Sequence, residues 1–158
     1  MEVIDNFLPL DEFKSLESIM MGDKFPWYYN DAICYQGDNL FQFVNCFYNI
    51  NGIDNGLFHL IEPYLHNFVI KKLYRIKANR RPRSSFNRKS FYHIDYPNMS
   101  TAILYINTNN GYTKFKKGGK VKSVSNRVVI FDSNLEHAGF TCSDEKTRVV
   151  INFNYEAN

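Results

Sequence analysis

The stretch SFYHIDYPNMSTAILYIN, residues 90–107, joins a short polar pattern to an apolar, strand-like run. One residue separates His93 from Asp95, and the pair stands directly before the apolar run. Such a His-x-Asp pair is a chance occurrence, a surface ion pair or two of the three ligands of a metal site. The run at 101–107 predicts a strand directly after them.

The composition predicts one folded domain over residues 1–158. Hydrophobic residues make up 44% of the chain and aromatic residues 16%, which is enough for a packed core. A chain of this length normally forms a single domain. The net charge of +3 is too small to indicate a nucleic-acid-binding protein by itself.

The chain shows no export or membrane signal. The first residues, MEVIDNFLPLDEF, are acidic where a signal peptide is basic, and no apolar stretch reaches transmembrane length. Cys34, Cys46 and Cys142 are far apart and lack metal-binding spacing, so we expect reduced thiols. We therefore expect a cytoplasmic protein.

Two helices are predicted in the first part of the chain. Apolar residues at helical spacing predict one over 10–21, with Gly22 as a left-handed C-terminal cap. A second is predicted over 57–69, with Asp54 as its N-cap and a kink at Pro63. The aromatic stretches 25–29 and 41–48 predict extended segments. His59 and His66 lie opposite the apolar stripe of the second helix, so we expect them to face solvent rather than bind a ligand.

The pattern from residue 73 onward is typical of strands. It has period two, short turns and glycines, and it predicts strands at 73–79, 101–107, 113–115, 121–124, 128–131 and 148–155. Such a series forms a sandwich or a barrel, of which the jelly roll is one form. We predict an α+β fold that is mainly β, with 1–72 as helical and strand support and 73–155 as the jelly-roll core.

His137 is the candidate third ligand. It follows the apolar strand RVVIF and a turn rich in Asp, Ser and Asn. A jelly roll can bring such a turn back over an earlier strand, beside His93 and Asp95. Two imidazoles and one carboxylate on one face of an ion suit non-haem Fe(II).

Arg148 is a candidate anion ligand. Alternation in RVVINFNY places Arg148, Asn152 and Asn154 on one face of the strand and apolar residues on the other. An arginine that points into a small barrel needs a partner, and a ligand carboxylate would satisfy its guanidinium group. Alternatively, Arg148 faces solvent or pairs with Asp132 or Asp144.

Tyr105 shares a strand face with Thr101, Ile103 and Asn107. Its hydroxyl group could therefore reach the same pocket and donate to a bound carboxylate. The alternative is that Tyr105 is an ordinary core residue.

Together, His93-x-Asp95, His137 and Arg148 resemble the pattern of Fe(II)- and 2-oxoglutarate-dependent dioxygenases. The resemblance is to the prolyl-4-hydroxylase-like branch and to its short relatives in phage genomes. It covers roughly residues 73–155, including ILYIN, NRVVIFD, HAG and RVVINFNY. If the chain is of phage origin, its compartment would be the host cytoplasm.

The resemblance implies a double-stranded β-helix, with the N-terminal helices packed on one sheet. It implies that His93, Asp95 and His137 bind Fe(II), and that 2-oxoglutarate pairs with Arg148, assisted by Tyr105. Asn152 and Asn79 are further candidates for this pocket. O2 is the co-oxidant, and the products include succinate and carbon dioxide.

Two positions refine what the resemblance implies. Halogenating relatives carry a small residue where this chain has Asp95, so its carboxylate favours hydroxylation. Many prolyl hydroxylases have a Gly-Gly pair where this chain has Gly111 and Tyr112. We expect Tyr112 to narrow the mouth of the pocket.

The basic stretch 77–89 precedes the first ligand and is expected to form a loop at the entrance. It could attract an anionic substrate such as a nucleic acid, a nucleotide or an acidic protein. The favoured alternative is a solvated loop without a partner, because runs of charge usually only keep a surface soluble.

Other classes of function remain open. One is a nucleic-acid or protein interaction module without catalysis on a jelly-roll scaffold, and another is a metal isomerase of the cupin type. Succinate production that depends on 2-oxoglutarate would distinguish the dioxygenase from both.

Overall fold

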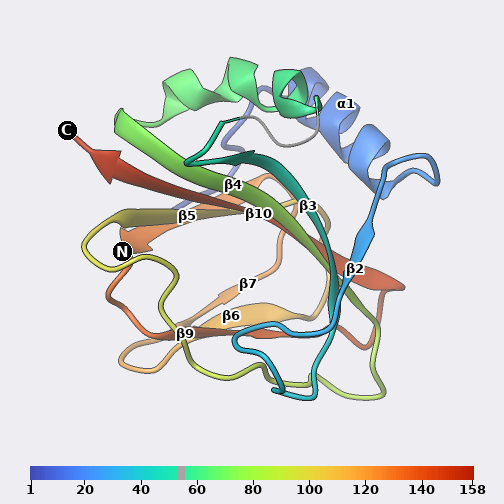
Figure 1. Cartoon of the computed structure of the whole chain (residues 1–158). Coiled ribbons are helices and arrows are strands. Elements are labelled where there is room, and N and C mark those ends of the chain that lie inside the picture. The colour runs from blue at the N-terminus through green and yellow to red at the C-terminus, as the bar shows by residue number, and fades with distance from the viewer. Residues whose placement is uncertain (53–55) are drawn as a thin grey trace.

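The computed structural model describes residues 1–52 and 56–158 (Figure 1). Within these residues, ten strands form two antiparallel sheets, and helices lie along one side of the larger sheet. The helices are α1 (Leu10–Met21) and the 3-10 helices η1 (Phe58–Leu60) and η2 (Glu62–Asn67). The strands are β1 (Glu2–Ile4), β2 (Tyr28–Asn30), β3 (Gln42–Asn49), β4 (Ile70–Pro82), β5 (Ser100–Tyr105), β6 (Tyr112–Phe115), β7 (Lys120–Lys122), β8 (Arg127–Asp132), β9 (His137–Phe140) and β10 (Thr147–Ala157).

The two sheets form the predicted jelly roll. The larger sheet has the strand order β1-β8-β5-β10-β4-β3-β2, and the smaller has the order β7-β6-β9. The last strand, β10, lies in the middle of the larger sheet, between β4 and β5. The predicted α+β fold, mainly β and with helices on one sheet, is confirmed.

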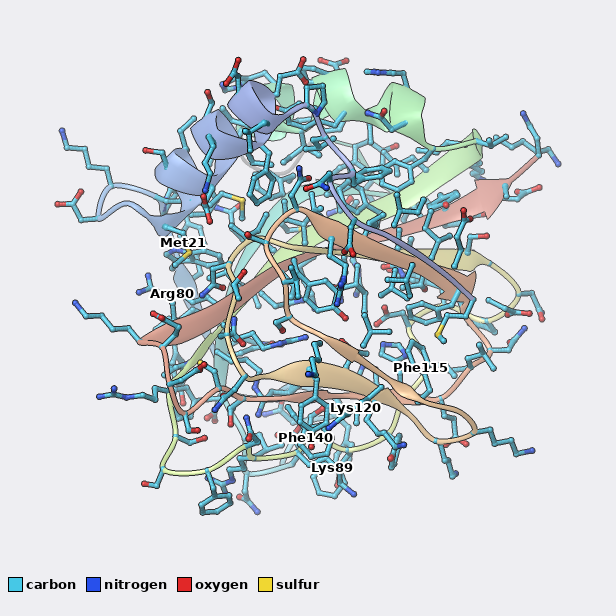
Figure 2. All side chains as sticks on the ribbon, turned by 180° about the vertical axis from the view of Figure 1, so that it is seen from behind. Met21, Arg80, Lys89, Phe115, Lys120 and Phe140 are labelled. Atoms are coloured by element: carbon cyan, nitrogen blue, oxygen red, sulfur yellow. The ribbon has the colours of Figure 1, made fainter. Side chains whose placement is uncertain are left out.

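Each face of the larger sheet packs against a different core. On the outer face, Val149, Ile151 and Phe153 of β10 pack with residues of α1. On the inner face, Val150 packs with residues of the smaller sheet, including Phe115. Figure 2 shows side chains filling the space on both sides of the larger sheet. The alternation predicted for β10 is therefore confirmed.

The first helix forms where it is predicted, because Phe13, Leu16 and Met20 bury one face against the sheet. The predicted cap at its end is wrong. Gly22 has φ −69° and ψ 164°, which is extended backbone rather than the left-handed region. Its N–H group still donates to the carbonyl groups of Ser18 and Ile19, so the helix ends without a left-handed residue.

The second predicted α-helix is wrong in type. Residues 58–67 form η1 and η2, whose backbone bonds link residues three apart, as from Leu60 N–H to Leu57 O. Pro63 has no N–H group and blocks a continuous α-helix through this segment. The apolar residues still face the outer core, and Ile61 is fully buried. The predicted N-cap, Asp54, lies outside the described residues.

One further expectation about the strands is corrected. The basic stretch 77–89 is not all loop, because β4 continues to Pro82 and pairs with β10 along its whole length. His137 follows the turn after β8, as expected, and begins β9, which pairs with β6. Cys34, Cys46 and Cys142 form no disulfide bond within the described residues. Across 1–52 and 56–158, no helix combines the length and apolar character needed to cross a membrane.

Candidate metal centre

His93 and His137 face each other because their backbones are paired. Each donates its N–H group to the other's carbonyl oxygen at 3.0 Å, so the two residues form an isolated antiparallel bridge. Residues directly opposite in such a pair carry their side chains on the same face. The two imidazole centroids are accordingly 4.7 Å apart.

Asp95 completes a three-residue cluster with the histidines. One possible ligand atom from each of His93, Asp95 and His137 lies within 4.8 Å of the other two. His93 Nε2 and Asp95 Oδ1 are 3.8 Å apart. Neighbouring ligands of an octahedral ion with bonds of about 2.1 Å lie about 3 Å apart, so a small side-chain rotation would let these atoms share an ion. Two imidazole nitrogens and a carboxylate oxygen are the donor set that suits non-haem Fe(II).

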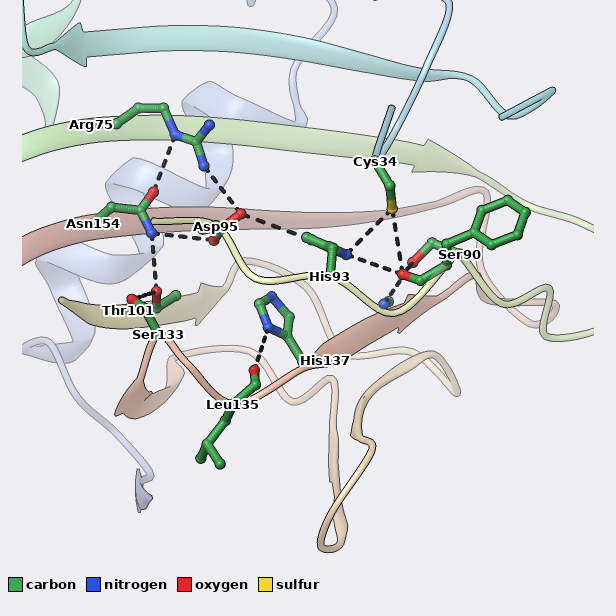
Figure 3. Close-up of polar contacts among 12 residues, drawn as sticks. Cys34, Arg75, Ser90, His93, Asp95, Thr101, Ser133, Leu135, His137 and Asn154 are labelled. Carbon is green, nitrogen blue, oxygen red and sulfur yellow. Dashed lines mark hydrogen bonds and ion pairs between the residues drawn. The ribbon is translucent and has the colours of Figure 1, made fainter. Parts of the chain in front are cut away.

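Backbone carbonyl groups orient both imidazoles. His93 Nδ1 lies 3.1 Å from Phe91 O, and His137 Nδ1 lies 3.2 Å from Leu135 O (Figure 3). A proton on each Nδ1 satisfies these carbonyl groups and leaves each Nε2 lone pair free for an ion. Burial lowers the pKa of His137, and His93 lowers it further, which favours the neutral, ligating form.

Asp95 is held by neighbours on β4 and β10 (Figure 3). Arg75 Nη2 lies 3.2 Å from its Oδ1, and Asn154 Nδ2 donates to its Oδ2 at 3.2 Å. Burial opposes ionisation of Asp95, but Arg75, the histidines and Asn154 outweigh burial and hold its pKa below the ordinary value. The carboxylate is therefore ionised and fixed on the side that faces the imidazoles.

A cavity of about 190 Å³ extends from this cluster between the sheets. Its lining includes all three residues of the cluster and, from the central strands of the larger sheet, the candidates Asn79, Arg148 and Asn152. The site residues expected from the sequence therefore meet at one cavity, with the exception of Tyr105. Tyr112 is not in the lining, because its ring stacks on Phe140 with centroids 4.2 Å apart, so the expected narrowing of the pocket mouth is wrong.

Arg148 is only 4% exposed and has no acidic partner in the described part of the chain. Its Nε donates to Ser123 Oγ at 2.8 Å, and its Nη2 donates to Thr113 Oγ1 at 3.1 Å. These bonds leave the guanidinium charge without compensation, and burial lowers its pKa. A carboxylate in the cavity would compensate it.

Tyr105 supports Arg148 instead of lining the cavity. It is fully buried, its hydroxyl group donates to Thr113 Oγ1 at 2.9 Å, and its ring centroid lies 5.5 Å from the Arg148 guanidinium carbon. The structure thus combines the two alternatives, because Tyr105 is a core residue that contacts the arginine.

Asn79 and Asn152 both line the cavity, and each is 9% exposed. The side-chain oxygen of each is buried without a hydrogen-bond partner within the described residues. Buried amide groups normally have partners, so these two favour a polar ligand in the cavity. His59 and His66 are exposed, as expected, and their Nδ1 atoms lie within hydrogen-bond distance of the local backbone carbonyl groups of Gly56 and Pro63.

Two polar residues at the site, Arg75 and Cys34, were not singled out from the sequence, and Lys77 and Arg81 were noted only as part of the basic stretch 77–89. Arg75, Lys77 and Arg81 of β4 line the cavity, and Cys34 Sγ lies 3.3 Å from His93 Nδ1. Continuing the period-two pattern of β4 through Pro82 would have placed these three basic residues on one face with Asn79. Nothing in the sequence indicates the contact with Cys34.

No family model and no curated protein matches the chain. Solved structures do share its fold. They include a 2OG-Fe(II) oxygenase family protein from Burkholderia pseudomallei, with a TM-score of 0.70 and 10% identity, covering 98% of this chain and 84% of that one. Another is the 2OG complex of a viral collagen prolyl hydroxylase from Paramecium Bursaria Chlorella virus-1, with a TM-score of 0.59 and 15% identity, covering 99% and 95%.

A third is the Trichoplax adhaerens prolyl hydroxylase in complex with a peptide from the hypoxia inducible factor oxygen degradation domain. It has a TM-score of 0.62 and 13% identity, and the match covers 98% of this chain and 83% of that one. At these identities the likeness establishes the fold that the sequence resemblance implied.

Proposed function

We propose that the protein is an Fe(II)- and 2-oxoglutarate-dependent oxygenase that hydroxylates a C–H bond. The observation that carries this proposal is the convergence of His93, Asp95 and His137 at a cavity that also contains the uncompensated charge of Arg148. Iron and 2-oxoglutarate, when bound with O2, supply oxidative decarboxylation to succinate and carbon dioxide coupled to oxidation of the substrate.

The chain's own residues prepare the metal site in two ways. The carbonyl groups of Phe91 and Leu135 fix the imidazoles with Nε2 available, and Arg75 and Asn154 fix the Asp95 carboxylate. A carboxylate at this position, instead of a small residue, supports hydroxylation over halogenation.

Arg148 would bind the far carboxylate of 2-oxoglutarate. Thr113 and Ser123 hold the guanidinium group in place, and Tyr105 packs against it. Because the arginine is buried, its attraction for a carboxylate is little screened by water. Asn79 and Asn152 supply further polar groups to the same cavity.

The primary substrate is a protein, a nucleotide or a small molecule. The Trichoplax relative in complex with a peptide supports a protein substrate, and the cationic lining of the cavity supports an anionic one. Three cysteines without a disulfide bond in the described residues support the cytoplasm as the compartment.

The test is succinate production. Protein loaded anaerobically with Fe(II) is mixed with 2-oxoglutarate and O2, and succinate is measured over time. We expect slow uncoupled turnover in the wild type, none in His137→Ala, and a strongly raised 2-oxoglutarate requirement in Arg148→Ala. Unchanged succinate in both variants would refute the proposed roles.

Two matched substitutions control for general damage to the fold. His59→Ala removes an exposed histidine, and Arg80→Ala removes an arginine that packs over the Trp27 ring on the other face of β4. Both should behave like the wild type. Absence of succinate in the wild type together with salt-dependent nucleic-acid binding would favour the non-catalytic module, and turnover without 2-oxoglutarate would favour the isomerase.

A further inference from the structure

The inner face of β4 carries four polar side chains into the cavity. Arg75, Lys77, Asn79 and Arg81 alternate along the strand and all line the cavity. Arg80, between the last two, points to the opposite face, where its guanidinium carbon lies 5.8 Å from the Trp27 ring centroid. Figure 2 shows Arg80 at the periphery of the molecule. The strand thus concentrates positive charge on its cavity side.

Within residues 1–52 and 56–158, no acidic side chain lies in ion-pair contact with Lys77 or Arg81. Arg75 is paired with Asp95, the one carboxylate among the described lining residues. Neither Lys77 nor Arg81 forms an ion pair with a described residue. The one hydrogen bond of the Arg81 side chain goes from Nη1 to Gly139 O at 2.8 Å, and its Nε has no partner among those residues. Arg81 is buried and Lys77 is partly buried, and cations withdrawn from water without an ion-pair partner are costly, so a site that keeps both indicates an anionic ligand.

Burial of both groups has the same consequence for their pKa values. Burial, followed by Arg75, lowers the pKa of Lys77 to about 8. Burial, followed by Arg148, lowers the pKa of Arg81 to about 10. Each cation is therefore destabilised in the absence of a ligand, and a bound anion would relieve this.

2-Oxoglutarate alone does not account for these charges. The cavity lining contains four basic side chains, Arg75, Lys77, Arg81 and Arg148, against one carboxylate. In the proposed function, one carboxylate of 2-oxoglutarate binds at the metal centre and the other pairs with Arg148. The Asp95 carboxylate already pairs with Arg75. Lys77 and Arg81 then remain uncompensated.

Two buried amides lie beside Lys77. Asn152 of β10 is its cross-strand partner, and Asn79 is two residues along the same face of β4. Each has a side-chain oxygen without a partner in the described residues. An amide group can rotate to present either its N–H donors or its oxygen, so both can complete the hydrogen bonds of an anionic group.

We propose that Lys77 and Arg81 form a second anion-binding position in this cavity, which takes a carboxylate or phosphate group of the primary substrate. The inference rests on the proposed function, since it assumes that 2-oxoglutarate occupies Arg148. Substrate bound there would lie within the same cavity as the metal centre, with Asn79 and Asn152 contacting the anionic group.

The test uses acetate and inorganic phosphate as probes, which distinguish the two kinds of anion. Metal-loaded, 2-oxoglutarate-saturated protein is kept anaerobic, and its melting temperature is followed while each probe replaces chloride at constant ionic strength. We expect at least one probe to stabilise the wild type. The apparent affinity for that probe should fall at least tenfold in Lys77→Met and in Arg81→Met, since each removes a charge-assisted hydrogen bond.

Matched controls lie on the same strand. Arg80→Met removes the neighbouring arginine on the other face, and Lys72→Met removes an exposed lysine over the Tyr74 ring. Both should keep the wild-type response. Lack of stabilisation of the wild type by either probe, or the same response in all variants, would overturn the proposal.

Titration with 2-oxoglutarate separates this proposal from the proposed function. Lys77→Met and Arg81→Met should keep their 2-oxoglutarate affinity within about threefold, whereas Arg148→Ala should lose most of it. A large loss of 2-oxoglutarate affinity in Arg81→Met would show that this arginine binds 2-oxoglutarate, and it would overturn the proposed second anion-binding position. If the wild type fails to bind 2-oxoglutarate, the proposed function fails. The titration with acetate and phosphate is then carried out on the protein without 2-oxoglutarate, and it still tests whether Lys77 and Arg81 bind an anion.

Discussion

Lys77 shows how a single strand position differs from its neighbours. Lys71 and Lys72 of the same strand are exposed, and Lys71 pairs with Glu156 at the surface. Lys77 instead lies on the cavity face, opposite Asn152. The amino acid is the same, but its surroundings turn a solubilising group into a costly charge.

Replacing Lys77 should therefore stabilise the ligand-free protein in a pH-dependent way. Its pKa is about 8 in the folded state against 10.5 in the unfolded state, so the cost is fully present below pH 8 and disappears above pH 10.5. We expect the free energy of unfolding of Lys77→Met to exceed that of the wild type at pH 7 by an amount on the order of 3 kcal/mol. The difference should shrink as the pH rises from 8 to 10.5.

Urea denaturation at a series of pH values measures this difference. The groups around Lys77 are Arg75, which lowers its pKa further, and Asp95, Cys46 and Cys34, which raise it. Lys72→Met should change the free energy of unfolding by less than about 0.5 kcal/mol at each pH. A Lys77→Met variant that is less stable than the wild type at pH 7 would mean that the lysine has a stabilising partner.

The smaller sheet positions the site through backbone contacts. The segment that carries Ser90 and His93 runs beside β9, with bonds from Ser90 N–H to Gly139 O and from His93 N–H to His137 O. This segment therefore extends the smaller sheet beyond β9, and its backbone bonds set the distance between His93 and His137. Strand β6 is the neighbour of β9 in this sheet. Gly111 directly precedes β6 and lies against the Arg148 side chain.

Gly111→Ala should damage the Arg148 side of the pocket. A Cβ atom at this position would lie 2.7 Å from Arg148 Cδ and 2.9 Å from the backbone oxygen of Phe140, and the backbone oxygen cannot move easily. We expect a loss of stability of about 1–3 kcal/mol. Because Arg148 must shift, we also expect a raised requirement for 2-oxoglutarate, measured by titration alongside urea denaturation.

Gly119→Ala is the matched control, because nothing lies within 4 Å of a Cβ atom there. It should leave both the stability and the 2-oxoglutarate requirement close to those of the wild type. If Gly111→Ala behaves in the same way as Gly119→Ala, Arg148 is not fixed by close packing against β6.

At the scale of the whole molecule, distant parts of the chain share one sheet. β1 pairs with β8, β3 pairs with β4, and the C-terminal strand β10 lies between β4 and β5. Residues 1–72 therefore supply strands to the same sheet as the jelly-roll core. We propose that residues 1–158 fold as a single cooperative unit.

Two optical signals can test this proposal. Trp27, the single tryptophan, packs against Phe25 with ring centroids 4.9 Å apart, and so reports on the N-terminal part. Far-UV circular dichroism reports on the sheets as a whole. We expect the two urea transitions to coincide. Separate midpoints would show that the N-terminal part unfolds independently.

The sequence by itself determined the features that depend on local periodicity. Strand alternation divided β10 into an apolar face and a face with Arg148 and Asn152, since neighbouring residues of any strand point in opposite directions. The spacing of His93 and Asp95 gave two candidate ligands for the same reason. The chemical types of the candidate ligands and of the arginine were also available from the sequence.

Only the tertiary structure decided which residues meet. The His93–His137 pair depends on backbone bonds between distant segments, and Asp95 depends on Arg75 and Asn154 from two other strands. Such contacts depend on which strands become neighbours, and local spacing does not specify this. The burial of Lys77 likewise follows from the packing of the two sheets, because a strand pattern gives two faces but does not say what covers each of them.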